Sequence, residues 1–267
     1  MNRIEKRFKD LKRLGKKAFI AYITTGDPTI KATEKLIMEL DRSGVDILEL
    51  GVPFSDPMAD GPTIQAASER ALRNKVNIRS ILSLVKRVRG KTGLPIALMT
   101  YYNPVYRYGV KEFVSSAKSS GVDGVIIPDL PPEEAEDLMA YSRKRDFSSI
   151  FLLSPTSSLR RIELVGKASR GFVYYVSLTG VTGARKSLPP EIVTNVRRIK
   201  KVTKKPVCVG FGVSTPLQAK TIARIADGVI VGSAIIKVIE KNLKSKDLAK
   251  KVGGFVRPLV RAVKEIA

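Results

Sequence analysis

Two short phrases recur along the sequence, and each marks the end of a helix that turns into a buried strand. The first is Gly or Ala, one further residue and Asp, followed by an apolar run, at 44–50, 121–127 and 226–232. The second is Pro followed by an apolar run, at 94–99 and 205–212. Glycine commonly ends a helix, and a short apolar run bounded by turn residues is typical of a fully buried strand. These phrases predict five such strands.

Apolar runs at 18–24, 149–154 and 172–177 raise the number of predicted strands to eight. All eight are nearly continuous in apolar residues, as parallel strands buried on both faces are. Amphipathic segments separate them and predict helices, at 29–43, 64–73, 78–89, 110–119, 132–145, 159–168, 190–202 and 216–225.

Eight strands that alternate with helices predict a single (β/α)8 TIM barrel over residues 1–267, because this fold commonly takes about 250 residues. No break in composition marks a second domain. Residues 1–14 and 247–266 predict extra terminal helices packed on the barrel. A doubly wound open sheet is the alternative, but no G-x-G-x-x-G motif opens a helix after the first strand.

The composition excludes several kinds of chemistry. The chain has no His, so the commonest general base, metal ligand and activator of a nucleophile is absent, and we expect no metal site. Its one cysteine, Cys208, lies in an apolar run and is interpreted as a packing residue. The amino-terminal residues do not resemble a signal peptide, and no apolar run is long enough to span a membrane, so we expect a cytoplasmic protein.

The positive charge of the chain is a separate question. Its 48 Lys and Arg residues against 25 Asp and Glu give a formal net charge of +23, which is high enough to suggest nucleic-acid binding. These basic residues lie mainly in predicted helices and their flanks, and aromatic residues are not interleaved with them as in a base-stacking surface. We interpret them as a solvated helical exterior and expect no nucleic-acid partner.

Glu49 is the clearest candidate for chemistry, because the active site of a barrel lies at the carboxyl ends of its strands. Alternation along the second strand places Val45, Ile47 and Glu49 on one face, so the carboxyl group shares a face with core residues. Burial without a partner raises the pKa of a carboxyl group, which suits a residue that donates and accepts protons near neutral pH. A structural salt bridge with a base from elsewhere in the fold is the alternative.

The loop after this strand, at 51–62, is rich in Pro and Gly and contains two more carboxylates, Asp56 and Asp60. Asp60 precedes Gly61 and Pro62, so it could be only the N-cap of the next helix, because Asp is a favoured cap and Pro a favoured first-turn residue. The local pattern leaves both the cap and a catalytic role open.

Three later strand ends carry glycines and hydroxyl groups, at 180–185, 210–214 and 232–234. Glycine lets the backbone approach a ligand closely, and the amino end of a helix offers free N–H groups and the positive end of the helix dipole. The last two loops together predict a phosphate site, in the place where many barrels bind phosphate. The expected substrate is therefore a small phosphate ester.

The segment LELGVPFSDPMADGPTIQ at 48–65 resembles the signature of the tryptophan synthase α chain family, and the similarity continues in order at 101–105, 121–134, 174–185, 209–214 and 227–235. Membership implies a lyase of tryptophan biosynthesis. Its reaction is the retro-aldol cleavage of indole-3-glycerol phosphate to indole and glyceraldehyde 3-phosphate, with no metal or cofactor in this chain. The resemblance also implies a partner, the β chain, which carries pyridoxal phosphate and receives indole through a tunnel in an αββα heterotetramer.

The resemblance implies a role for each matched position. Glu49 would donate a proton to indole C3 and then accept one from the glycerol hydroxyl, and Asp60 would hydrogen-bond the indole N–H. The positions that border the substrate are Tyr174 and Thr182. The apolar slot for the indole, for which core packing is an alternative explanation, would be formed by Phe19, Tyr22, Met99, Ile126 and Leu152. The phosphate pocket would consist of Gly183, Phe211, Gly212, Gly232 and Ser233. The positions expected to face the β chain are Asp56, Pro57 and Asn103.

Two rival functions fit parts of the sequence. One is a stand-alone lyase that releases indole without a partner chain. The other is a catalytically idle barrel that binds nucleic acid through its charge, and the presence of both Glu49 and Asp60 argues against it. The marked basicity and Met58 are the departures from the family pattern.

Overall fold

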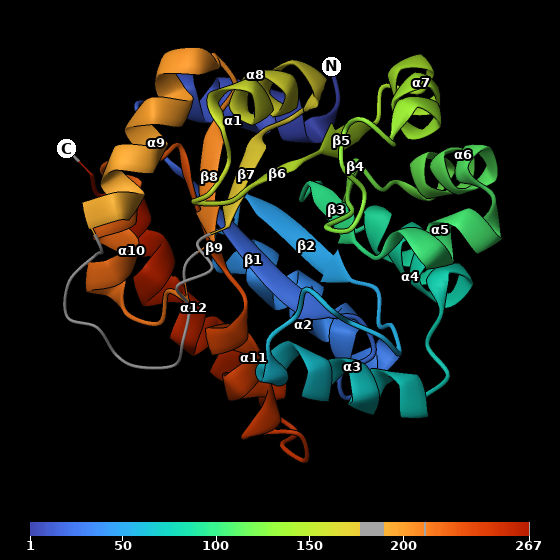
Figure 1. Cartoon of the computed structure of the whole chain (residues 1–267). Helices are drawn as coiled ribbons and strands as arrows, with labels where there is room; N and C mark the ends of the chain where they lie inside the picture. The colour runs from blue at the N-terminus through green and yellow to red at the C-terminus, as the bar shows by residue number, and fades with distance from the viewer. Residues whose placement is uncertain (177–189, 211, 267) are drawn as a thin grey trace.

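The computed structural model describes residues 1–176, 190–210 and 212–266. In Figure 1 the strands lie at the centre and the helices lie around them. The strands of the described residues are β1 (Ala18–Thr24), β2 (Ile47–Gly51), β3 (Ile96–Met99), β4 (Gly124–Ile126), β5 (Ser148–Ile150), β6 (Leu152–Leu153), β7 (Val173–Val176), β8 (Val207–Gly210) and β9 (Gly228–Val231). The helices are α1 (Arg3–Arg13), α2 (Ile30–Arg42), α3 (Pro62–Arg73), α4 (Ile78–Arg89), α5 (Tyr102–Tyr108), α6 (Val110–Ser120), α7 (Glu136–Lys144), α8 (Leu159–Ala168), α9 (Pro190–Val202), α10 (Pro216–Ala223), α11 (Ser233–Glu240) and α12 (Leu248–Lys264).

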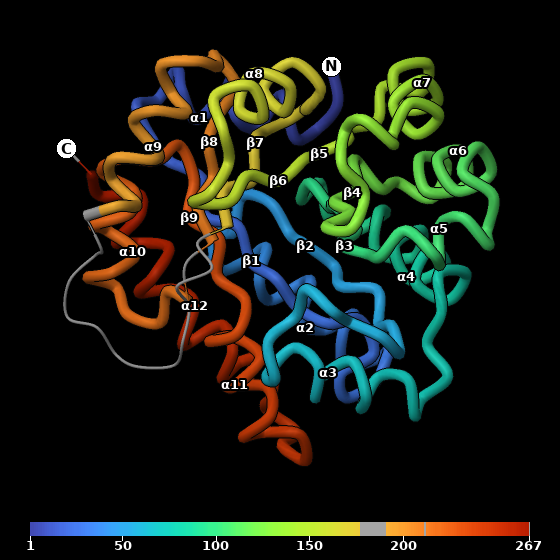
Figure 2. The backbone as a smooth tube through the Cα atoms, in the orientation of Figure 1, coloured from blue at the N-terminus to red at the C-terminus, as the bar shows by residue number. Residues whose placement is uncertain are grey.

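The strands form one parallel sheet in the order β5-β4-β3-β2-β1-β9-β8-β7-β6. Its two ends, β5 and β6, are consecutive in the chain and are separated only by Phe151, so Figure 2 shows them as one continuous segment. β5 pairs with β4, and β6 pairs with β7. The strand predicted at 149–154 therefore changes partner at its middle and closes the sheet. The predicted (β/α)8 barrel is confirmed.

Alternation along the strands divides the apolar core into two clusters. Side chains such as Ile20, Ile47 and Ile230 point to one face and fill the interior of the barrel. Side chains one position along, such as Leu48 and Val229, pack against the surrounding helices. Both clusters are fully apolar, which explains why the strands read as continuous apolar runs in the sequence.

Helix α1 closes the amino-terminal end of the barrel. Ile4 and Phe8 belong to the interior cluster. The Asn2 side chain donates hydrogen bonds to the Asp123 carbonyl oxygen (3.2 Å) and to Ser148 Oγ (2.7 Å), near the starts of β4 and β5. A cavity in the barrel must therefore open at the other end, where the strands finish.

The aspartates of the recurring phrase connect neighbouring strands at this closed end. Each one accepts a hydrogen bond from the backbone N–H group at the start of the adjacent strand, in the pairs Asp46 with Phe19 (2.7 Å), Asp123 with Ile96 (2.9 Å) and Asp227 with Val207 (3.0 Å). Each carboxylate also forms ion pairs with Lys or Arg side chains. The phrase thus marks a structural device, and part of the positive charge neutralises these three carboxylates.

Several helices differ from the sequence prediction. Helices α5 and α11 were not among the predicted segments, and α7 begins at Glu136 although a helix was predicted from 132. Residues 131–135 instead form successive turns, with hydrogen bonds from Glu134 N to Pro131 O (3.1 Å) and from Ala135 N to Pro132 O (3.3 Å). The predicted terminal helices are confirmed as α1 and α12. Of the helices in the described part of the chain, none combines the length and apolar character that crossing a membrane requires.

Candidate active site

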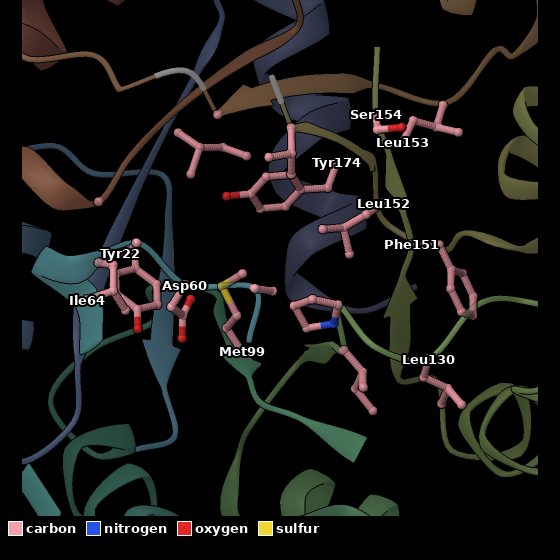
Figure 3. Close-up of a pocket in the computed structure, with 18 of the residues that line it drawn as sticks. Tyr22, Asp60, Ile64, Met99, Leu130, Phe151, Leu152, Leu153, Ser154 and Tyr174 are labelled. Carbon is pink, nitrogen blue, oxygen red and sulfur yellow. The ribbon is translucent and has the colours of Figure 1, made fainter. Parts of the chain in front are cut away.

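A cavity of about 810 Å³ opens at the carboxyl ends of the strands. Figure 3 shows Asp60 between Tyr22 and Met99, with Leu152 and Tyr174 on the other side of the cavity. These residues come from four different strands and from the loop after β2. The barrel therefore gathers side chains that are up to 152 positions apart in the chain, from Tyr22 to Tyr174.

Glu49 lies on β2 directly opposite Tyr22 of β1 in the register of the parallel pair. Its side chain is fully buried, and neither carboxyl oxygen has a hydrogen-bond partner among the described residues. Burial in this environment raises the pKa of Glu49 to about 8, because the charged form loses its solvation and gains no compensating partner. Among the described residues, no Lys or Arg side chain forms the salt bridge that the sequence left open as an alternative. Glu49 is mainly protonated at neutral pH and can act as a proton donor.

Asp60 lies in the loop between β2 and α3 and lines the cavity. It is not the N-cap of α3, because Gly61 takes that position and no side chain caps the helix. Burial raises the pKa of Asp60 to about 6, against the lowering effect of a hydrogen bond from the Tyr101 hydroxyl. Near pH 7 Asp60, which lines the cavity, is therefore ionised, whereas Glu49, which is fully buried on β2 and does not itself line the cavity, is mainly protonated.

The tyrosines around the two carboxyl groups remain protonated. Burial, followed by the charge of Asp60, raises the pKa of Tyr22, and burial, followed by the charge of Glu49, raises the pKa of Tyr174. A phenol that keeps its proton is a hydrogen-bond donor at every relevant pH. The Tyr22 hydroxyl lies 3.3 Å from Thr24 Oγ1.

Tyr101, which follows β3, is a residue that the sequence prediction missed. Its hydroxyl oxygen accepts a hydrogen bond of 2.9 Å from the backbone N–H of Ala59, next to Asp60. The motif YYNPV at 101–105 contained it, but only Asn103 was selected there. A tyrosine at a strand end gives no local signal that distinguishes it from a packing residue.

The predicted phosphate loops lie at the same cavity. Gly232 is the N-cap of α11 and Ser233 is its first residue, and no side chain caps this helix. Both residues line the cavity together with Gly212, whose φ of 50° is in the left-handed region that favours glycine. The uncapped end of α11 thus directs free N–H groups and the positive end of its dipole at the cavity. Thr182, Gly183 and Phe211 lie outside the described residues.

The apolar slot contains only part of the predicted set. Met99, Leu152 and Tyr22 line the cavity. Ile126 packs in the interior cluster beside Met99 and Leu152 but does not line the cavity. Phe19 points the other way and packs in the cluster against the helices, because it lies an odd number of positions, three, before Tyr22 along β1. Core packing accounts for these last two side chains.

The residues expected to face a partner lie on two neighbouring strand-end segments, the loop at 52–61 and helix α5. Asp56 and Asn103 are exposed, and Pro57 is half-buried. Two large apolar side chains on the same segments are also exposed, with Met58 at 94% and Tyr106 at 68%.

Comparisons with known proteins agree with this geometry. The family model described as tryptophan synthase alpha chain matches residues 8–263. The tryptophan synthase alpha chain of Geotalea uraniireducens is 50% identical over 100% of this chain and 99% of its own. A crystal structure of tryptophan synthase subunit alpha from Legionella pneumophila is 41% identical, with a TM-score of 0.93 over 100% of both chains. A structure of Mycobacterium tuberculosis tryptophan synthase is 39% identical over 98% of both chains, with a TM-score of 0.91. Because the family model matches residues 8–263 and the relatives are similar over the full chain, this chain belongs to the tryptophan synthase alpha chain family.

Proposed function

We propose that this chain cleaves indole-3-glycerol phosphate to indole and glyceraldehyde 3-phosphate, with Glu49 as the acid-base group and Asp60 as the partner of the indole nitrogen. The observation that carries the proposal is that burial sets two carboxyl groups, Glu49 on β2 and Asp60 in the loop after it, on opposite sides of neutrality, with pKa values of about 8 and about 6. Two carboxyl groups whose environments separate their pKa values are the usual basis for an acid and an anion in one site.

The cleavage requires two proton transfers at one residue. In the first, protonated Glu49 donates its proton to indole C3, which makes this carbon tetrahedral and places a positive charge on the ring nitrogen. The Asp60 carboxylate accepts a hydrogen bond from the N–H group and stabilises this charge. In the second, the Glu49 carboxylate accepts the proton of the hydroxyl next to the bond, the aldehyde forms, and the bonding electrons return to the indole ring. Glu49 ends the cycle protonated, so no other group has to supply or remove a proton.

The remaining parts of the cavity fit the two ends of this substrate. The amino end of α11, with Gly232 and Ser233, would bind the phosphate, and Gly212 would allow the close approach of the backbone. Met99 and Leu152 would contact the indole ring. Gly183 and Phe211 stay predicted phosphate contacts, and Thr182 and Tyr174 stay predicted to border the substrate.

The exposed strand-end rim would bind the β chain. Asp56, Pro57 and Asn103 are the proposed contacts, and the exposed Met58 and Tyr106 supply apolar area beside them. The pyridoxal phosphate of the complete αββα assembly would belong to the β chain, which would take up the indole released here.

The test is indole release from indole-3-glycerol phosphate, measured with and without an added β chain. We expect activity that the β chain increases. Glu49→Gln should keep substrate binding, measured by calorimetry, but lose at least 100-fold in turnover, because general acid-base groups typically contribute about 10²–10⁴-fold. The matched control is Glu163→Gln, an exposed glutamate on α8. No indole in either condition would refute the enzymatic proposal, and full activity without the β chain would refute the dependence on a partner.

A further inference from the structure

The loop that carries Asp60 is attached to the end of β3 through one side chain, Tyr101. The Tyr101 ring stacks on Phe54, near the start of the loop, with ring centroids 5.3 Å apart and an interplanar angle of 29°. Its hydroxyl oxygen accepts the backbone N–H of Ala59, near the end of the loop, at 2.9 Å. The Tyr101 side chain is buried, with 6% of its surface exposed. One residue thus holds both ends of the segment from 54 to 59.

The hydrogen bonds of this phenol fix the direction of its proton. A tyrosine hydroxyl has one hydrogen to donate, and here the Ala59 N–H occupies its acceptor side. The donor side is left for the Asp60 carboxyl group, on the residue next to Ala59, whose pKa a hydrogen bond from Tyr101 lowers against the effect of burial. Only an ionised carboxylate is purely an acceptor, so a fixed donor favours the ionised form.

Among the described residues, the other ionisable groups near Asp60 do not supply this donor in the same way. Tyr174 lines the cavity from β7, Glu49 is fully buried on β2 and does not line the cavity, and the Tyr22 hydroxyl has Thr24 as its hydrogen-bond partner. Asp129 faces Tyr101 from the segment after β4, but both of its carboxyl oxygens accept the Tyr102 N–H, at 2.9 and 3.1 Å. Arg161, on the cavity wall, pairs with Glu133 at 2.6 Å.

We propose that Tyr101 is a positioning residue for the reaction, which anchors the loop through Phe54 and Ala59 and directs its O–H at the carboxyl group of Asp60, where that group lines the cavity. This inference rests on the proposed function for its catalytic consequence. Its structural part, the hydrogen bond to Asp60, can be measured without any turnover.

The test is Tyr101→Phe, which removes the hydroxyl and keeps the ring that stacks on Phe54. The primary measurement is the titration of the Asp60 carboxyl carbon by NMR in ¹³C-labelled protein, with the signal assigned by its loss in Asp60→Asn. We expect the pKa of Asp60 to rise from about 6 by about one unit, because a hydrogen bond to a charged group typically shifts a pKa by this amount or more. The control is Tyr102→Phe, which removes the neighbouring hydroxyl and should leave the titration unchanged.

The kinetic measurement is the pH profile of kcat/KM for indole release by the same variants. The acid limb should move with the pKa of Asp60. The kcat/KM of Tyr101→Phe should therefore be about fivefold lower than that of the parent chain at pH 6 and nearly equal to it at pH 8. The basic limb, set by Glu49, should not move. An unchanged Asp60 titration in a variant with an unchanged melting temperature overturns the proposal, and so does a loss of kcat/KM that is the same at every pH. If the parent chain releases no indole, the proposed function fails, while the NMR titration still decides the role of Tyr101.

Discussion

Replacing Glu49 by Gln should stabilise the fold at pH 8 and change its stability little at pH 5. In the folded chain the pKa of Glu49 is raised to about 8 from the ordinary value of 4.5, because the carboxyl group is buried without a partner. A carboxyl group whose folded pKa is raised contributes its full stability below the unfolded pKa, and this contribution is lost as the pH rises through the folded pKa. The window of the effect is therefore pH 4.5 to 8.

The size of the effect follows from the gap between the two pKa values. Each unit corresponds to about 1.4 kcal/mol, so the raised pKa of Glu49 costs the fold about 3 kcal/mol at pH 7, where only the unfolded chain ionises this residue, and about 5 kcal/mol above pH 8, as orders of magnitude. Glutamine has nearly the same shape and does not titrate. Its buried amide lacks partners much as the neutral carboxyl group does, so the two chains should differ by only about 1 kcal/mol at low pH.

The assay is equilibrium unfolding by urea of the parent chain and Glu49→Gln at several pH values from 5 to 8.5. The difference in unfolding free energy should grow by about 1.4 kcal/mol per pH unit up to pH 8 and then level off. Other titrating groups are common to both chains and cancel in the difference. A difference that is the same at pH 5.5 and pH 7.5 would refute the reasoning, because it would mean that Glu49 does not change its proton binding on folding in this range.

Two further predictions concern the cavity. The pH profile of kcat/KM should be bell-shaped, with limbs near pH 6 and pH 8, because activity needs an ionised Asp60 and a protonated Glu49; a profile that still rises above pH 9 would contradict this assignment. Gly51→Ala should lower kcat/KM at least tenfold and destabilise the fold by about 1–3 kcal/mol, because its Cβ would lie 2.2 Å from the buried Tyr22 hydroxyl oxygen. The control is Gly93→Ala, which has open space around the new methyl group. Indole release and melting temperature are measured for both variants. If the two variants have equal values, Tyr22 moves aside freely and the reasoning fails.

The repeated phrases and the period of the apolar residues determined the strands, the helices between them and the barrel. These features are local, since a strand buried on both faces needs a continuous apolar run wherever it lies in the chain. Alternation along β2 placed Glu49 on the interior face beside Ile47, and the structure confirms its burial. The two-residue period of the strand thus predicted the buried carboxyl group of Glu49 from the sequence.

The tertiary structure decided the contacts between residues that come from different strands and loops. The first N–H of α5 is bound by Asp129, which lies 27 positions further along the chain, so no local cap announces this helix. Asp60 had the sequence of a helix cap, but Gly61 takes that place and the carboxyl group turns into the cavity.

The contacts of Asp60 show the physical reason. Its pKa and its partner Tyr101 depend on how β2 and β3 pair side by side, because Asp60 follows β2 and Tyr101 follows β3 in the chain. Local sequence sets which face a side chain occupies, because backbone geometry repeats every two residues. Burial and electrostatics act through space, so they are set by neighbours that the barrel brings together and that the sequence keeps far apart.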